Sequence, residues 1–246
     1  MISNNKIVVL LTGTINPNSF KTLVLIDPEV RKKQYIDAIS YYLIKTSYNI
    51  VFTENSGVSL KKYFKGFEDR IEFLVYKLEK EDKEKDKGKG FKELGIIDYT
   101  IENSKRIREA EYIIKITGRL KVLNLNILVD KFLAKNKKNS EIVSCNIFKL
   151  KKMDSRCFIF SLDFWPYLKN ERENVNLNYS FEMALWNSVI CYNLKEGVFK
   201  QLFSPLRIKG VSGGFGTSYD HGLLKFKIKQ IIHVLRTPFW YNKILK

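Results

Sequence analysis

The sequence predicts an α/β fold in which helices cover a mostly parallel sheet. Three observations lead to this prediction. Apolar runs rich in β-branched residues alternate with segments of helical periodicity through the first 135 residues. Several of these runs end in a small polar turn, and the first run is apolar along its whole length, as buried parallel strands are. This alternation is typical of a doubly wound, Rossmann-like sheet, which binds ligands at the carboxyl ends of its strands.

The first elements follow in the order that such a sheet requires. A strand is expected over residues 7–11, just before a polar turn. A helix is expected to begin after Asp27, a favourable N-cap that precedes Pro28, and its helical spacing continues to about Thr46. Alternating or β-branched runs predict further strands at 49–53 and 70–76.

The rest of the chain contains one long charged segment and then more closely spaced strands. Residues 77–92 hold seven lysines and five acids, which predicts an exposed loop. Helices are expected near 94–101, 125–133 and 181–189, and strands at 112–116, 142–148 and 156–162. The later strands suggest an α+β extension of the same sheet. We expect one domain over residues 1–222 and a basic amphipathic C-terminal tail over 223–246.

Composition limits the classes of partner and site. With 45% apolar and 28% charged residues, the 246-residue chain can form a packed core. Its 43 Lys and Arg against 26 Asp and Glu give a net charge of +17, which indicates a polyanionic partner such as nucleic acid, an acidic membrane or a phosphorylated ligand. Three cysteines without CxxC spacing and two histidines exclude a disulfide framework, a cysteine-rich zinc site and a multi-histidine metal centre. Without a secretory signal or a long apolar segment, the expected compartment is the cytoplasm.

Small polar residues collect where three of the predicted strands end. These turns are 12–14 (Thr-Gly-Thr), 54–57 (Glu-Asn-Ser-Gly) and 117–119 (Thr-Gly-Arg). Each alone is ordinary turn chemistry, but together with the Gly-Lys-Gly segment 88–90 they indicate a nucleotide site. The acid and amide suit ribose or a base edge, while Lys115 and Arg119 suit phosphates. The sequence lacks GxGxxG, GxxxxGK[ST] and GxSxG, which argues against dinucleotide dehydrogenases, P-loop NTPases and α/β-hydrolases.

The order of these pieces resembles the GT-A glycosyltransferases, specifically a bacterial group that builds capsule and lipopolysaccharide-type glycans. The resemblance spans about residues 6–220 and is carried by segments 11–15, 27–31 with Tyr35, 52–57, 88–93, 114–119 and 210–214. It implies a GT-A-like fold, a nucleotide-sugar donor and a glycan or lipid-linked acceptor. The donor-binding residues that it implies are Thr12, Gly13, Thr14, Arg31, Glu54, Asn55, Lys89, Gly90, Glu93, Lys115, Thr117, Gly118 and Arg119.

The chain departs from the GT-A pattern at the end of the fourth strand. The family places a metal-binding Asp-x-Asp motif there, whereas this chain has Lys115 and Arg119. Two fixed cations can stabilise a leaving diphosphate, so a divalent metal, Mg²⁺ or Mn²⁺, is disfavoured and no metal ligands are assigned. Asp130 and Asp163 are the remaining candidate acids. Asp163 ends a predicted strand and either lines the acceptor pocket or is an ordinary turn residue.

Glu182 is the candidate catalytic base. An inverting transferase uses a carboxylate to deprotonate the acceptor hydroxyl, and the family places this base near the start of a late helix. Glu182 has that position. Two alternatives stay open: a first-turn Glu stabilised by the helix dipole, and an acceptor-binding residue in a retaining enzyme.

Two features of the C-terminal region have competing interpretations. The glycine-rich segment 210–219 either closes over a diphosphate or connects to the tail, and His221 beyond it is more often structural than catalytic. In the tail, apolar residues share one helical face and basic residues another. This pattern favours an interfacial helix at the anionic cytoplasmic face of the inner membrane over a helix packed on the core. Alternative functions are nucleic-acid binding, disfavoured because no known module is present, and a degenerate transferase fold acting as a scaffold.

Overall fold

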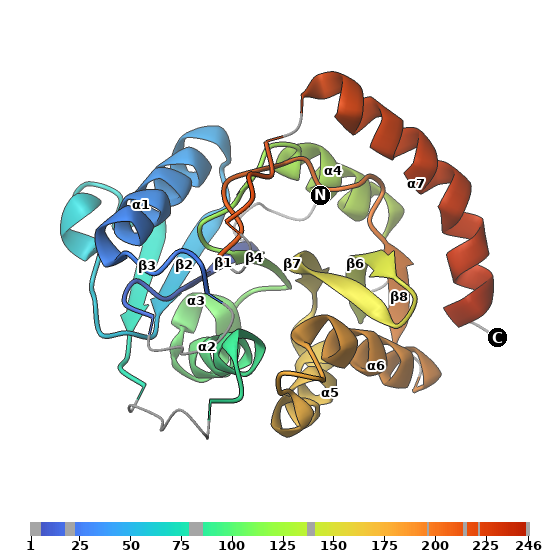
Figure 1. Ribbon diagram of the computed structural model, residues 1–246, viewed down its shortest axis with the longest axis horizontal. Helices are drawn as coiled ribbons and strands as arrows, with labels where there is room; N and C mark the ends of the chain where they lie inside the picture. The colour runs from blue at the N-terminus through green and yellow to red at the C-terminus, as the bar shows by residue number, and fades with distance from the viewer. Residues whose placement is uncertain are drawn as a thin grey trace.

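The structure is a computed structural model that describes residues 6–17, 23–78, 86–136, 141–195, 197–213, 216–220 and 222–244, with side chains of the last helix as far as Arg236. Within these residues, seven strands form a sheet in the order β3-β2-β1-β4-β7-β6-β8, and two short strands, β5 and β9, form a second sheet (Figure 1). The strand bounds are β1 Ile7–Gly13, β2 Asn49–Glu54, β3 Ile71–Val75, β4 Tyr112–Thr117, β5 Lys121–Val122, β6 Ile142–Lys149, β7 Lys152–Phe160, β8 Val198–Gln201 and β9 Ile208–Lys209.

Helices cover both faces of the large sheet, which confirms the predicted α/β class. One buried apolar cluster joins the sheet to α1 and α4, and the other joins it to α2, α5 and α6. The helix bounds are α1 Pro28–Lys45, α2 Lys89–Asn103, α3 Lys105–Arg108, α4 Leu125–Lys135, α5 Trp165–Asn170, α6 Phe181–Leu194 and α7 Leu223–Ile244. The sheet is mostly parallel, as predicted: β3, β2, β1 and β4 are parallel neighbours, and β6 is parallel to β8.

β7 is the exception, and its direction decides which residues meet. It is antiparallel to both β4 and β6, with Ile116 opposite Cys157 and Ile113 opposite Phe160. The start of β7 therefore lies at the edge where β1 and β4 end, and its C-terminal end lies at the opposite edge. Asp163, which follows β7, accepts a hydrogen bond from Tyr192 at that opposite edge. Of the two alternatives for Asp163, this placement contradicts the acceptor-pocket residue and fits the ordinary turn residue, since Asp163 lies in a short 3-10 turn far from the ends of β1 and β4.

The two helix starts that matter for the site are built differently. Asp27 caps α1 as predicted, since its carboxylate accepts hydrogen bonds from the backbone N–H groups of Glu29 and Val30. α2 begins at Lys89, inside the segment expected to be loop, while 79–85 lie outside the described residues. Gly88, at φ +88°, turns the chain into α2, and Gly90 packs closely against Phe181 of α6.

α7 lies along the outside of the molecule, next to α4 and β8 (Figure 1), and turns its apolar face away from the body. Its contacts with the body are largely polar: His233 Nε2 is 2.8 Å from the Leu202 carbonyl oxygen, and Gln230 donates to Ser204 Oγ at 3.4 Å. Five apolar side chains of the predicted face are 40–75% exposed: Leu224, Ile228, Ile231, Ile232 and Leu235. The alternative that this face packs on the core is therefore wrong.

Candidate functional site

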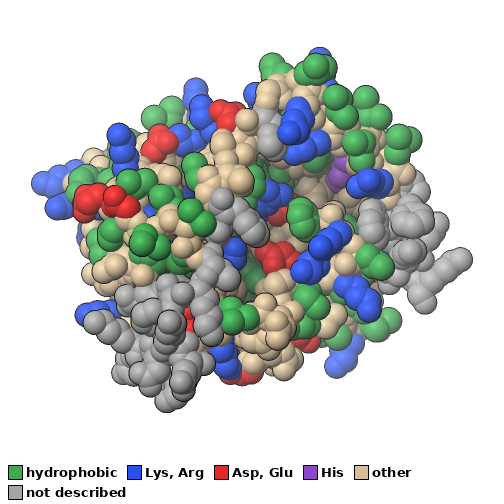
Figure 2. Space-filling view, viewed as in Figure 1, with side chains coloured by type: hydrophobic (Ala, Val, Ile, Leu, Met, Phe, Trp, Pro, Cys, Tyr) green, Lys and Arg blue, Asp and Glu red, His purple; other side chains and the backbone are tan. Residues whose placement is uncertain are grey.

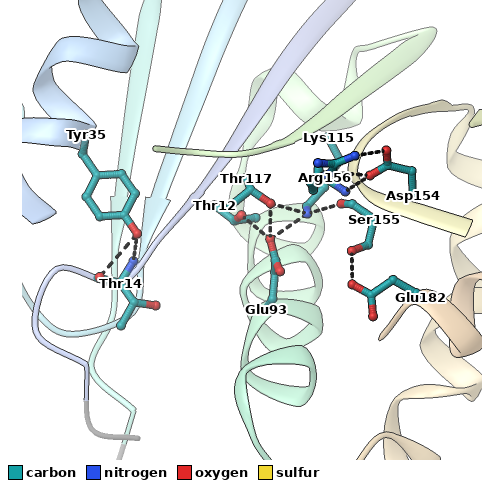
Figure 3. Close-up of polar contacts among 10 residues, drawn as sticks. All are labelled: Thr12, Thr14, Tyr35, Glu93, Lys115, Thr117, Asp154, Ser155, Arg156 and Glu182. Atoms are coloured by element: carbon teal, nitrogen blue, oxygen red, sulfur yellow. Dashed lines mark hydrogen bonds and ion pairs between the residues drawn. The ribbon is translucent and has the colours of Figure 1, made fainter. Parts of the chain in front are cut away.

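A carboxylate from α2 joins the ends of β1 and β4. Glu93 Oε1 accepts hydrogen bonds from Thr12 Oγ1 at 2.8 Å and from Thr117 Oγ1 at 3.2 Å (Figure 3). Thr12 and Thr117 occupy paired positions of the parallel register, so their hydroxyl groups lie side by side at the carboxyl edge of the sheet. The structure thus brings together three of the predicted donor-binding residues.

Lys115 is the buried cation of the same cluster. Its Nζ lies 2.6 Å from Glu93 Oε1 and donates to the Ser155 carbonyl oxygen at 2.7 Å and to Thr117 Oγ1 at 3.3 Å. The side chain is completely buried, and Nζ lies 5.1 Å from the ring centroid of Phe181. Because Lys115 is already paired with a carboxylate, its charge is not available to a ligand in the way that the sequence suggested.

Ser155 links this ion pair to the candidate base. Its hydroxyl donates to Glu182 Oε1 at 2.8 Å, while its carbonyl oxygen accepts the Lys115 hydrogen bond (Figure 3). Glu182 is half-buried in the first turn of α6. One continuous set of polar contacts therefore runs from Thr12, at the end of β1, to the carboxylate predicted to act as base.

The N-termini of α2 and α6 meet beside this cluster. A Cβ at Gly90 would lie 3.2 Å from Phe181 Cβ, closer than Cβ atoms usually approach, so a larger residue would have to push the two helix starts slightly apart. Both ends carry partial positive charge, which favours an anion or a carboxylate at this place. Figure 2 shows acidic and basic side chains gathered near the centre of this face of the molecule.

Two arginines, Arg31 and Arg119, lie on the α1 side of the turn that follows β1. Arg31 Nε donates to the Thr14 carbonyl oxygen at 2.7 Å, and Tyr35 Oη accepts from the Thr14 backbone N–H at 2.8 Å. Arg119 Nη1 donates to Gln34 Oε1 at 2.9 Å. Arg31 is 4% exposed and Arg119 8% exposed, and Arg119 Nε is buried without a hydrogen-bond partner. Burial lowers the pKa of Arg31, and the nearby charge of Arg119 lowers it further.

The residues after β2 hold the β1 turn in place. Glu54 is fully buried, and its carboxylate accepts hydrogen bonds from the backbone N–H groups of Ile15 at 2.7 Å, Ser56 at 2.8 Å and Val58 at 2.9 Å, and from the Ser56 hydroxyl. Asn55 Oδ1 accepts from Thr14 Oγ1 at 2.6 Å. The structure therefore gives Glu54 a loop-organising position, and its predicted donor contact stays a prediction.

Three of the predicted glycines serve close packing or chain direction here. A Cβ at Gly118 would lie 2.6 Å from the Thr12 carbonyl oxygen, and one at Gly13 would lie 2.6 Å from Phe52 Cζ. Lys89 is exposed in the first turn of α2, one residue before Gly90. Gly118 therefore lets the ends of β1 and β4 lie close together, Gly13 leaves room for the Phe52 ring of β2, and Gly90 lets α2 pack on α6.

The other candidate acids and the glycine-rich segment lie elsewhere or are only partly described. Asp130 is exposed on α4, which packs on the opposite face from α2 and α6. His221 and residues 214–215 lie outside the described residues, whereas Gly213 backbone accepts from Val24 and lies beside Arg119. Across the described ranges, no three His, Cys, Asp or Glu side chains form a metal-binding group.

Sequence reasoning missed the part of the site that β7 contributes. Asp154 forms a two-pronged ion pair with Arg156, with distances of 2.8 and 2.6 Å, and Arg156 lies over the ring of Tyr219 at 5.0 Å. Asp154, Ser155 and Arg156 lie in the first half of β7, whereas the sequence predicted that this strand begins only at residue 156. The polar run 154–156 inside an apolar strand was the available signal.

Acid is expected to weaken the fold through Glu93. Burial by itself raises the pKa of Glu93, but Lys115 and the hydrogen bonds from Lys115, Thr12 and Thr117 outweigh burial and lower it below its usual value. The unfolded chain then binds more protons than the folded chain, so stability is present above the unfolded-state pKa and is lost as pH falls through the folded-state pKa. In urea unfolding, the stability difference between wild type and Glu93→Gln should be constant from neutral pH down to about pH 4 and should shrink below it. A difference that stays constant with pH would contradict this.

Comparisons with known proteins identify no family. No protein-family model matches the chain, and no curated protein matches it. Similar solved structures include a glycosyltransferase involved in glycosylation of the major capsid of PBCV-1, with 11% identity over 80% of this chain and 82% of that chain and a TM-score of 0.45. A cytidylyltransferase from Leptospira borgpetersenii has 13% identity over 80% and 75%, with a TM-score of 0.44. HddC from Yersinia pseudotuberculosis has 14% identity over 83% and 93%, with a TM-score of 0.47.

Proposed function

We propose that the protein is a glycosyltransferase that moves a sugar from a nucleotide-sugar donor to a glycan or lipid-linked glycan in capsule or lipopolysaccharide biosynthesis. The observation that carries the proposal is the continuous polar cluster from Thr12 through Glu93, Lys115 and Ser155 to Glu182. It lies at the carboxyl edge of a mostly parallel sheet, where α/β folds bind ligands. The residues of this cluster follow one another along the chain in the same order as the motifs that resemble those of the GT-A enzymes.

The donor diphosphate is assigned to Arg31 and Arg119. The sequence suggested Lys115 as the partner of Arg119, but Glu93 neutralises Lys115. Arg119 lies close enough to Arg31 for its charge to lower the pKa of Arg31. Both side chains are buried, and Arg119 Nε has no hydrogen-bond partner. Two buried, fixed guanidinium groups can stabilise the charge that develops on a leaving diphosphate. This assignment assumes no divalent metal, which the lack of Asp-x-Asp disfavours.

Glu182 is assigned the role of general base. In the proposed step, an acceptor hydroxyl gives its proton to the Glu182 carboxylate while its oxygen bonds to the anomeric carbon of the donor sugar. The bond from that carbon to the phosphate oxygen breaks, and its electron pair leaves with the nucleotide. Ser155 holds one carboxylate oxygen of Glu182, which leaves the other oxygen for the acceptor.

Removing Arg119 should abolish transfer. We expect nucleotide sugars, screened as UDP, GDP and CMP compounds with and without chelator, to raise the melting temperature of wild type. Arg119→Ala should remain folded but lose both this rise and turnover, because the diphosphate loses a fixed cation. Arg108→Ala, an exposed arginine on α3, is the matched control and should behave as wild type. Wild-type turnover in Arg119→Ala would refute the diphosphate role. Salt-dependent oligonucleotide binding without a nucleotide response would favour the nucleic-acid alternative.

We also propose that α7 binds the anionic cytoplasmic surface of the inner membrane, where a lipid-linked acceptor is presented. The proposal is supported by the exposed apolar face of α7 and by the basic residues beside it, including the exposed Lys225, Lys227 and Arg236. Among the described residues, no helix has the length and apolar character needed to span a membrane. A helix that lies in the interface fits both observations.

Vesicle binding tests the role of α7. Ile231→Glu should weaken sedimentation with anionic phosphatidylglycerol vesicles by about tenfold or more, since a buried Ile side chain contributes about 1.5–3 kcal/mol. Leu194→Glu changes a side chain that is 78% exposed on α6 and should leave binding unchanged. Equal effects of the two substitutions, or concentration-dependent dimers of wild type in place of vesicle binding, would contradict the membrane role.

A further inference from the structure

A small pocket separates α7 from the start of β7 and from the chain around β9. It has a volume of about 40 Å³ and is lined by Arg156, Leu206, Arg207, Ile208, Tyr219, Phe226 and Lys229. A single water needs roughly 10–15 Å³ measured in this way, so the pocket holds about three groups of water size. That is the scale of the oxygens of one phosphate group.

The charges around the pocket are mostly positive. Arg156 is neutralised by Asp154, and the same carboxylate also acts electrostatically on Lys229. Among the described residues, Arg207 forms no ion pair with a carboxylate. Arg207 lies 6.0 Å from the ring centroid of Phe226, and its Nε is buried without a hydrogen-bond partner. Burial lowers the pKa of Lys229, and the charges of Lys225 and Arg156 lower it further. Like charges held together at a partly buried place favour a bound anion.

The pocket and the candidate site share neighbouring residues of β7. Arg156 lies directly after Ser155, which binds both Lys115 and Glu182. On the other side, Phe226 and Lys229 belong to the inward face of α7, whose outward face carries the exposed apolar residues. A ligand held here would touch the helix proposed to lie on the membrane and the strand that carries Ser155.

We propose that this pocket is a second anion site, distinct from the donor site, that binds a phosphate group of the acceptor or of a lipid headgroup. Arg207 and Lys229 supply the charge, Arg156 supplies a guanidinium whose position Asp154 fixes, and Tyr219 closes one side. The phosphate chemistry follows from the pocket itself, and only the identity of its carrier rests on the proposed function.

The direct test is calorimetric titration of the full chain, at constant ionic strength, with inorganic pyrophosphate, of which one phosphate group would enter the pocket and the other would remain outside it. Lys229→Ala should weaken one pyrophosphate site by about tenfold, as expected for loss of one charge-assisted contact. Lys227→Ala removes the same charge from an exposed position of the same helix and should leave this site unchanged. Arg207→Gln should act like Lys229→Ala. Binding of nucleoside diphosphates should be the same in all of these proteins, which separates this pocket from the donor site.

Vesicle binding distinguishes the two phosphate sources. If the ligand is a lipid headgroup, Lys229→Ala weakens binding to phosphatidylglycerol vesicles more than Lys227→Ala does. If it is a soluble acceptor phosphate, the two substitutions weaken vesicle binding equally and only Lys229→Ala weakens pyrophosphate binding. Equal pyrophosphate binding by wild type, Lys229→Ala and Arg207→Gln overturns the proposal, and so does an equal loss in Lys227→Ala. Because pyrophosphate needs no sugar transfer, a failure of the transferase proposal leaves this test intact.

Discussion

Glu182→Gln is expected to lower the turnover of sugar transfer by about 10³-fold, within the range of about 10²–10⁴ typical for loss of a general base. Glutamine keeps the size of the side chain and can still accept the Ser155 hydrogen bond, which spans 2.8 Å in the wild type. It cannot take up the acceptor proton. The expected pattern is therefore a fall in kcat with unchanged nucleotide-sugar binding and unchanged melting temperature.

Two further variants define what this result means. Glu173→Gln removes a carboxylate that is 71% exposed and paired with Lys87, and it should transfer sugar at the wild-type rate. Ser155→Ala removes only the contact that positions Glu182, so it should reduce kcat less than Glu182→Gln and shift the pH profile of kcat. Near wild-type turnover in Glu182→Gln would leave Glu182 as a first-turn residue that the dipole of α6 stabilises.

Lys115→Met is expected to destabilise the protein by about 3–5 kcal/mol, because it leaves a buried carboxylate without its cation. Lys115 is completely buried and Glu93 is only 20% exposed, so water can replace the lost partner only in part. The Ser155 carbonyl oxygen loses its donor in the same variant. The free energy of unfolding from urea titration at neutral pH measures the loss.

The double variant Lys115→Met/Glu93→Gln should recover much of that stability. Glutamine is uncharged, yet its oxygen can still accept from Thr12 and Thr117. The matched control is Lys105→Met, since Lys105 is 80% exposed and lies 3.8 Å from Glu109, and such surface pairs contribute little. If Lys115→Met is no less stable than Lys105→Met, the ion pair is not the structural centre of the site.

The two predictions separate stability from chemistry within one cluster. Glu93 and Lys115 neutralise each other and hold the ends of β1 and β4 together, whereas Glu182 is half-buried at the other end of the cluster. Loss of the ion pair should lower stability, and loss of Glu182 should lower only turnover. Because Glu93 neutralises Lys115, the fixed cations that we propose for the diphosphate are Arg31 and Arg119, which lie on the α1 side of the β1 turn.

Local sequence patterns were enough to predict several of the elements and the strand-end turns. Periodicity, the Asp27 cap and the polar turns after three strands depend on neighbouring residues, and they predicted α1, β1, β2, β4 and the meeting of the β1, β2 and β4 turns. The start of α2 was placed late, because the charged segment before it hid the helical first turn formed by Lys89 and Gly90.

The pairing of the charged side chains could not be predicted in the same way, because it depends on how the strands and helices pack. The antiparallel direction of β7 carried Ser155 to the site and Asp163 to the opposite edge, and no local pattern encodes strand direction. Likewise, Lys115 and Arg119 stand four residues apart, but Lys115 meets Glu93 whereas Arg119 meets Gln34. The physical reason is that burial and pairing of a charge depend on residues distant in sequence, which the packing of helices on the sheet brings together.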